Sequence, residues 1–136
     1  MTLVDTCIWS LALRRNRKDL NPHEKYIVFA LRDLLVAGKA KTIGPVRQEL
    51  LSGISSSTLF NDIQEYVESL PDIPLTNDIW TLAAQFFNTC RAAGIATDAI
   101  DMTICAAAVS HDVSIFTTDP DFVRYAAVLP LKLFKP

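Results

Sequence analysis

Acidic side chains follow short apolar segments at both ends of the chain. Leu3-Val-Asp5 ends at a carboxylate, and Val113-Ser-Ile-Phe-Thr-Thr-Asp119 repeats this arrangement. In an open α/β sheet, side chains at the carboxyl ends of the strands converge on one crevice, which is the usual ligand position. Two strands that each carry an acid to that edge therefore predict a cation site.

Asp5, Asp98 and Asp101 each precede or begin a predicted helix, so N-capping is their ordinary structural interpretation. For Asp5, a cap and a ligand are equally good interpretations, because an ionised carboxylate straight after a buried strand is costly unless it is exposed, hydrogen-bonded or bound to a cation. Asp101 begins the most apolar helix, where capping is the default. Asp98 can supply that cap or a further ligand.

Asp119, Asp121 and Glu49 are weaker candidates when each is taken alone. Asp-Pro-Asp is a common turn composition, and an exposed Glu in a first helical turn is ordinary. The set is more informative, since four separate elements bring acids to one edge of the sheet. Clustered carboxylates raise one another's pKa unless a cation holds them. Oxygen ligands without His or Cys predict Mg²⁺ or Mn²⁺ rather than zinc, and magnesium is the usual equipment for phosphodiester hydrolysis.

The elements that must position these acids alternate between strands and helices. Strands are predicted at residues 2–4, 40–44, 113–117 and 131–134, with a very short one within 71–74. Helices are predicted at residues 7–13, 22–35, 45–51, 59–70, 77–90 and 101–109, and residues 120–125 form one irregular or helical turn. This alternation predicts a parallel sheet between helical layers. We therefore expect a three-layer α/β/α domain around a parallel sheet of four or five strands.

Length and composition predict one folded domain over residues 1–136. Half of the residues are apolar and the net charge is −2, which neither demands nor excludes nucleic acid. The three separated cysteines are expected to be reduced and buried, as in a cytosolic protein, and the isolated histidines argue against a zinc site. No apolar stretch approaches the ~18 residues that span a bilayer, and no signal sequence precedes the first strand, so we expect a cytoplasmic protein.

Four short motifs, in this order, resemble those of one known family. They are Leu3-Val-Asp-Thr, Glu49-Leu-Leu-Ser-Gly53, Ile100-Asp-Met-Thr-Ile-Cys-Ala106 and Phe116-Thr-Thr-Asp-Pro-Asp-Phe122. Together they cover essentially the whole chain. The chain resembles the PIN-domain ribonucleases and, more narrowly, the VapC type of toxin from bacterial toxin–antitoxin pairs.

The resemblance implies a metal site built from four acids, namely Asp5, Glu49, Asp101 and Asp119. The three aspartates would hold Mg²⁺ or Mn²⁺, while Glu49 would bind a second ion or orient the attacking water. Water would attack the phosphorus in line, with the metal offsetting charge in the transition state. Thr117 falls on a hydroxyl that typically lies beside the metal in such sites.

Three further positions belong to this comparison with the family. Thr6 is expected to neighbour the ligands rather than to be one of them. Cys7 stands where relatives often have Asn, so we expect that part of the site to be drier or differently hydrogen-bonded. Asp119 and Asp121 compete for the place of the fourth acid, and Asp119 is favoured because it follows the strand more closely.

The implied function is a growth-arresting, metal-dependent endoribonuclease that pairs as a homodimer and is controlled by a small cognate antitoxin. Trp80 and Phe87 lie off the apolar stripe of their helix, which is typical of an interface. The basic residues within 14–18 would guide RNA, or form a solvated loop. An Asp-based phosphotransferase is disfavoured, because no Lys lies at a strand end. A non-catalytic RNA-binding or protein-interaction module of the same fold is the other alternative, against which the retention of every acid argues.

Overall fold

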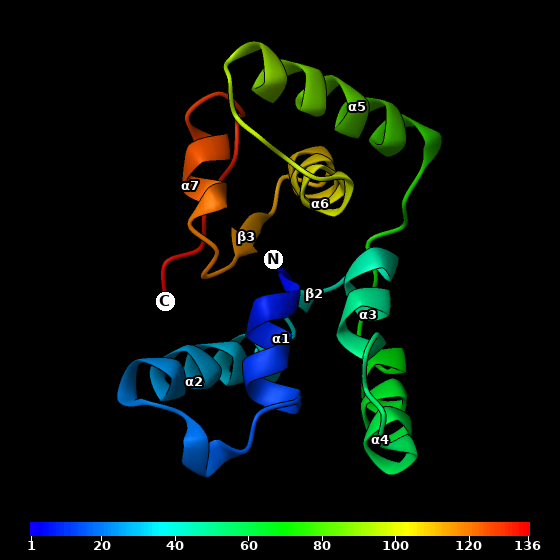
Figure 1. The fold of residues 1–136 in the computed structure, drawn as a ribbon, viewed down its shortest axis with the longest axis vertical. Coiled ribbons are helices and arrows are strands. Elements are labelled where there is room, and N and C mark those ends of the chain that lie inside the picture. The colour runs from blue at the N-terminus through cyan, green and yellow to red at the C-terminus, as the bar shows by residue number, and fades with distance from the viewer.

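A computed structural model describes residues 1–136 and contains three strands and seven α-helices, shown in Figure 1. The chain order is β1 (Thr2–Val4), α1 (Thr6–Leu13), the 3₁₀ turn η1 (Arg17–Asp19), α2 (Pro22–Val36), β2 (Ala40–Lys41), α3 (Gly44–Leu51), α4 (Ser57–Glu68), α5 (Asn77–Ala92), α6 (Ala99–Ser110), β3 (Ser114–Phe116) and α7 (Asp121–Ala126). The alternation of strands and helices that the sequence predicts is therefore present.

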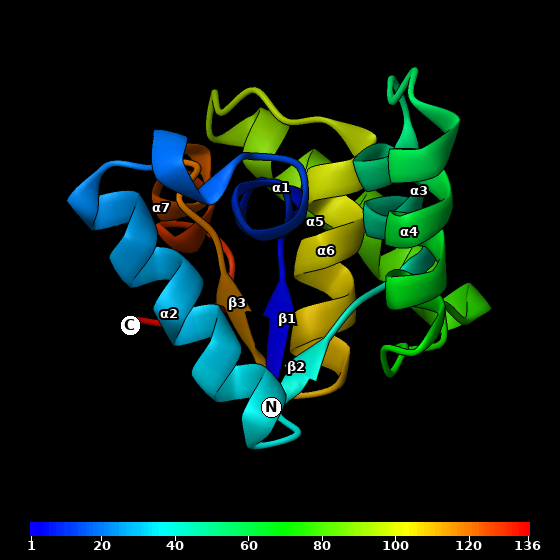
Figure 2. The same cartoon turned by 90° about the horizontal axis from the view of Figure 1, so that it is seen from below.

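The sheet is entirely parallel, with β1 in the centre and the order β2-β1-β3. Thr2 pairs with Ala40 on one side and with Ser114 on the other. Figure 2 shows the three strands pointing the same way, with α1 beyond the tip of β1. Side chains that follow β1 and β3 therefore reach the same edge of the sheet.

The two outermost strands that the sequence predicts are each reduced to a single bridge. Thr42 bridges Asp72 in parallel beside β2, and Ile115 bridges Leu133 beside β3. Prolines flank both segments, and a residue without an N–H group cannot extend a hydrogen-bonded ladder. The fold class is confirmed, but the regular sheet has three strands rather than four or five.

β2 is also shorter than predicted, because the chain turns into a helix sooner. The strand ends at Lys41, so the expectation that no Lys lies at a strand end was wrong. Ile43 is the N-cap of α3, and Pro45 lies in the first turn of that helix. Proline is pre-organised for a first helical turn, which favours an early helix start over three more strand residues.

Helices cover both faces of the sheet. In Figures 1 and 2, α6 packs against one face with α5 outside it, and α1 and α2 lie on the other face. Residues Met102 to Ala108 of α6 are all buried, as the nearly unbroken apolar sequence of this helix predicts. The start of α6 is thereby fixed beside the carboxyl ends of β1 and β3.

All three cysteines are free thiols, but only Cys90 and Cys105 are buried. Cys7 is half-buried, so the prediction that it is buried was wrong. It lies in the first turn of α1, where the chain leaves the sheet and faces the loop after β3. None of the helices has the length and apolar character that a membrane crossing requires.

Candidate metal centre

Asp5 is both a helix cap and a side chain of the site. It follows β1 directly, in extended conformation, and its Oδ1 accepts a hydrogen bond of 2.7 Å from the backbone N–H of Thr6. Its Oδ2 accepts a 2.7 Å hydrogen bond from the Thr117 hydroxyl, which lies just beyond β3. Capping and site membership are therefore compatible, because the cap uses only one oxygen.

At the start of α6, the cap is Asp98 and not Asp101. The Asp98 side chain accepts a 2.8 Å hydrogen bond from the backbone N–H of Asp101. The default prediction that Asp101 is the cap was therefore wrong. Asp101 lies in the first turn of the helix, and its Oδ2 accepts a 2.8 Å hydrogen bond from the Tyr125 hydroxyl. This leaves its other carboxylate oxygen without a hydrogen bond from the protein.

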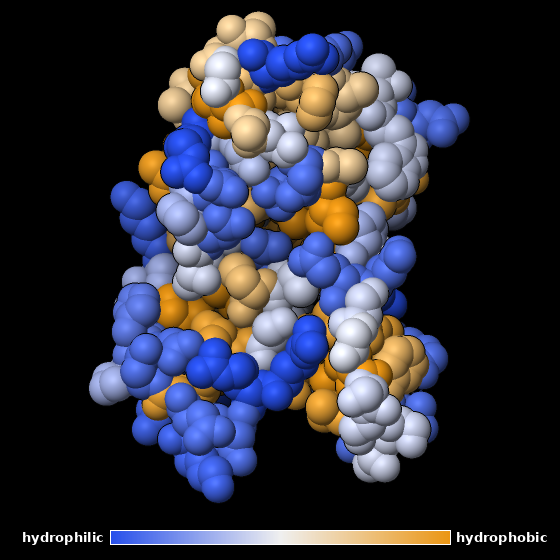
Figure 3. All heavy atoms as spheres, viewed as in Figure 1, coloured by the Kyte–Doolittle hydropathy of each residue, from blue (hydrophilic) through white to orange (hydrophobic).

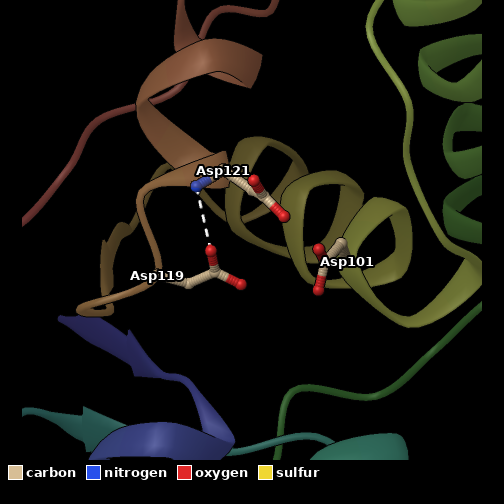
Figure 4. Close-up of side chains that lie close together, drawn as sticks. All are labelled: Asp101, Asp119 and Asp121. Atoms are coloured by element: carbon tan, nitrogen blue, oxygen red, sulfur yellow. Dashed lines mark hydrogen bonds between the residues drawn. The ribbon is translucent and has the colours of Figure 1, made fainter.

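Asp119 and Asp121 stand together opposite Asp101, as Figure 4 shows. One carboxylate oxygen from each of the three residues lies within 4.8 Å of the other two. The turn that the sequence predicts is present as well, since the backbone N–H of Asp121 donates to Asp119 Oδ1 over 2.9 Å. Both acids therefore face Asp101, and they differ in that Asp121 forms an ion pair with Arg124.

Thr117 connects the two parts of the site. Its hydroxyl donates to Asp5 Oδ2 and accepts a 3.0 Å hydrogen bond from the backbone N–H of Asp119. The carboxylate after β1 and the acidic turn after β3 are thereby held in a common hydrogen-bond network. Cys7 Sγ joins this network at 3.6 Å from Asp5 Oδ2 and 3.5 Å from the Thr117 hydroxyl.

Glu49 is not a member of the three-aspartate group. It is exposed on α3, outside the group formed by Asp101, Asp119 and Asp121, and lines a pocket of about 450 Å³ with Trp80. Its negative charge nevertheless raises the pKa of Asp5, so the two carboxylates lie in each other's field.

Burial and mutual repulsion both favour the protonated forms of the central acids. Burial raises the pKa of Asp5 against the lowering effect of the hydrogen bonds from Thr117 and Thr6. Burial also raises the pKa of Asp101 to about 6, and the charges of the neighbouring aspartates add to this effect, while the Tyr125 hydrogen bond opposes it. A cation placed among these carboxylates would relieve both effects.

The donor set fits a hard divalent cation. The three side chains that face one another here are all carboxylates, whose oxygen ligands suit Mg²⁺ or Mn²⁺. Next to Asp5, the buried Thr6 hydroxyl has no hydrogen-bond partner in the protein. Buried polar atoms are seldom left unpaired, so this hydroxyl is a suitable partner for water around an ion.

We predict that the metal-free protein loses stability as pH rises from about 4 to about 6. Asp101 has a folded-state pKa of about 6 against 3.8 in the unfolded chain, so the native state holds the extra proton in this window. The free energy of unfolding therefore falls with rising pH. Urea unfolding in EDTA at a series of pH values measures this slope. Asp101→Asn is expected to flatten it, and an unchanged slope in that variant would contradict the assignment.

Nothing in the sequence pointed to Tyr125 as part of the site. Its side chain is buried in α7, and its hydroxyl reaches Asp101 across the gap between two helices. A tyrosine with neighbouring apolar residues is indistinguishable from an ordinary core residue until the packing of α7 against α6 is known. The only available signal was its position one helical turn beyond Asp121.

The fold and the site together define an α/β protein with an oxygen-only carboxylate centre at the carboxyl edge of a parallel sheet. The model of the PIN domain family matches residues 2–128, and the chain therefore belongs to the PIN-domain family. PIN domains are generally nucleases, and PIN nucleases use divalent metals.

Several solved structures have the same fold. FitAcB from Neisseria gonorrhoeae superposes with a TM-score of 0.74 and 20% identity, covering 100% of this chain and 98% of the other. VapBC2 from Rickettsia felis, bound to a DNA fragment from its promoter, has a TM-score of 0.74 and 17% identity, and the match covers 98% of this chain and 96% of the other. VapBC-1 from nontypeable Haemophilus influenzae has a TM-score of 0.69 and 15% identity, and the match covers 98% of this chain and 96% of the other. No curated protein sequence matches the chain significantly.

Proposed function

We propose that this chain is a Mg²⁺- or Mn²⁺-dependent endoribonuclease that acts in the cytoplasm as the toxin of a type II toxin–antitoxin module. The observation that carries the proposal is the group of carboxylates from Asp101, Asp119 and Asp121, within 4.8 Å of one another, beside Asp5 in a PIN domain. The similarity of this chain in fold to the VapBC structures supports the proposal that it is a toxin.

Asp5, Asp101 and Asp119 are the proposed metal ligands. Asp119 is preferred over Asp121 because Arg124 already pairs with Asp121. A bound Mg²⁺ or Mn²⁺ supplies charge stabilisation for the phosphate oxygens and a more acidic water. Tyr125 and Thr117 orient the carboxylates of Asp101 and Asp5 through their hydrogen bonds.

Glu49 has a different role in this proposal. Its exposed carboxylate stands apart from the three-aspartate group, so it is suited to orient the attacking water or to bind a second ion. Thr6 follows Asp5 directly and has a buried hydroxyl without a partner in the protein, which supports the proposal that it neighbours the ligands.

The activity is tested by incubating the purified protein with end-labelled single-stranded RNA and with DNA of the same sequence, in Mg²⁺. We expect internal cleavage of the RNA only, and none by Asp119→Asn, which tests the choice between the two acids of the turn. Cleavage of DNA alone, or of neither strand, would refute the endoribonuclease.

We predict a homodimer that uses the outer face of α5. Trp80 is 48% exposed and Phe87 40% exposed, and they share the wall of a pocket of about 350 Å³. Apolar patches of this kind mark interfaces. Light scattering at concentrations on the order of tens of micromolar, where weak contacts dissociate, is expected to give a dimer. Trp80→Glu should give a monomer.

Val123→Glu is the matched control for this measurement, because Val123 is an apolar residue that is 65% exposed on a different helix, α7. We expect it to remain dimeric. A monomeric unmodified protein, or equal effects of the two variants, would refute this interface.

The proposed antitoxin inhibits by placing a basic side chain among Asp5, Asp101 and Asp119. An arginine matches carboxylates through paired hydrogen bonds, and it would compete with a cation for the same oxygens. Undiminished RNA cleavage by a saturated toxin–antitoxin complex would refute inhibition at the site.

A further inference from the structure

A pocket of about 530 Å³ lies next to the carboxylates, between α1, α2 and the loop after β3. Its walls include Ser10, Leu11, Arg15, His23, Ile27 and Thr118. None of these residues takes part in the metal centre described above. Figure 3 shows the corresponding face of the molecule, on which hydrophilic side chains cross the middle above a hollow.

Cys7 joins this pocket to the acidic site. Its side chain lines the pocket, and its Sγ lies 3.6 Å from Asp5 Oδ2. On the pocket side, the Thr118 hydroxyl donates to the same sulfur over 3.4 Å. If a phosphate of a nucleic-acid chain lies at Asp5, the neighbouring nucleotide of that chain can therefore reach the pocket.

The charges of the pocket favour a polyanion. Arg15 and His23 contribute basic groups, and the only carboxylate in the walls is that of Glu24. Glu24 accepts a 3.1 Å hydrogen bond from the backbone N–H of Asn21 and pairs with one guanidinium nitrogen of Arg15 at 3.4 Å. The two charges offset each other, and the remaining N–H groups of Arg15 are the donors that the pocket offers to a phosphate. Three further basic residues, Arg14, Arg17 and Lys18, are exposed in the segment that connects α1 to α2.

The pocket on the opposite side of the acids differs in charge. It lies between α3, α5 and α6, and its walls contain the carboxylate of Glu49 and no basic residue. Glu49 repels a phosphate group there, whereas the α1–α2 pocket offers hydrogen-bond donors on the Arg15 guanidinium and the His23 ring. The electrostatic difference selects the α1–α2 side for the substrate chain.

The remaining walls suit an unstacked base. Leu11 and Ile27 offer an apolar surface, while Ser10 and Thr118 offer hydroxyls at its margin. Proteins recognise single-stranded RNA by enclosing splayed bases and hydrogen-bonding their edges. We propose that this pocket binds the nucleotide adjoining the cleaved bond of a single-stranded RNA, with Arg15 and His23 as positioning residues. The inference rests on the proposed RNA cleavage for its substrate, but its binding test does not require cleavage.

Fluorescence anisotropy tests the pocket with a short labelled single-stranded RNA of mixed sequence, in an Asp101→Asn background that keeps the RNA intact. We expect Arg15→Ala and His23→Ala each to weaken binding at least about fivefold, and Arg15→Ala to reduce the salt slope by about 0.7 for one lost phosphate contact. The matched controls Arg14→Ala and His111→Ala, whose side chains lie outside the pocket, should change affinity less than about twofold.

Ser10→Phe fills the pocket without changing its charge. It should weaken binding of single-stranded RNA while leaving the salt slope unchanged, and an RNA duplex should bind more weakly than the single strand to the parent protein. Thermal unfolding of each variant confirms that the chain is folded. Equal losses in the Arg14 and Arg15 variants, or unaltered binding in Ser10→Phe, would overturn the pocket.

The outcome separates this inference from the proposed function. If the unmodified protein fails to cleave RNA but the binding differences hold, the pocket stands as a binding site for single-stranded RNA and the nuclease proposal falls. If RNA is cleaved and the Arg15 and His23 variants retain the KM of the parent, the pocket proposal alone falls. Variants that lose affinity for an antitoxin but not for RNA would assign the pocket to a protein partner and likewise overturn it.

Discussion

Asp101→Asn is expected to reduce RNA cleavage by about 100-fold or more, since stabilisation of transition-state charge by a metal is worth several kcal/mol and each 1.36 kcal/mol is tenfold. Asp101 faces the other two members of the three-aspartate group, and one of its oxygens accepts no hydrogen bond from the protein. Asparagine keeps the shape and can still accept the Tyr125 hydrogen bond. The loss therefore reports on charge and ligation rather than on folding.

Asp98→Asn is the matched control, because the two acids lie in the same turn. Asp98 caps α6, and asparagine is as good an N-cap as aspartate, so this variant keeps both the helix and the Asp101 backbone contact. Initial rates and circular dichroism of both variants give the comparison. A larger loss in Asp98→Asn than in Asp101→Asn would show that the wrong acid of this turn has been assigned to the metal.

Chelation is the second large effect. In excess EDTA we expect RNA cleavage to fall to background and to return when Mg²⁺ or Mn²⁺ exceeds the chelator, because carboxylates without a cation repel one another and the phosphate alike. Zinc should restore less activity, since the site holds no His or Cys in its carboxylate group. Full RNA cleavage in excess EDTA would show that the activity does not depend on a metal.

Thermal unfolding gives a measurement of the same site that does not depend on activity. A cation that binds only the folded chain raises the unfolding temperature according to its concentration relative to Kd. Mg²⁺ should therefore stabilise the unmodified protein more than Asp101→Asn. Equal stabilisation of both would place the bound ions elsewhere on the surface.

Local sequence determined much of the framework that positions the candidate site. The central strand at residues 2–4 and the apolar helix that begins near Asp101 were predictable because their residues are apolar almost without interruption, which only a buried element tolerates. The parallel sheet was predictable because strands alternate with helices along the chain. The acids after β1 and β3 were predictable as neighbours because parallel strands end at one edge.

Only the tertiary structure decided which acids cap a helix and which face one another at the site. Asp98 and Asp101 are both suitable caps, and the choice depends on which carboxylate reaches a free N–H once α6 packs against the sheet. Asp119 and Asp121 are rivals in sequence, yet both face Asp101 because the turn between them places their carboxylates side by side.

Long-range packing also created features that no sequence period encodes. The Tyr125 hydroxyl meets Asp101 only because α7 lies beside the start of α6, and the edge strands shrink to single bridges because prolines remove their donors. The pocket beside Cys7 is formed by residues of α1, α2 and the loop after β3, which is far from these helices in the sequence. Types and order of residues specify elements and candidate ligands, whereas side-chain partners arise from contacts between elements that are distant in the chain.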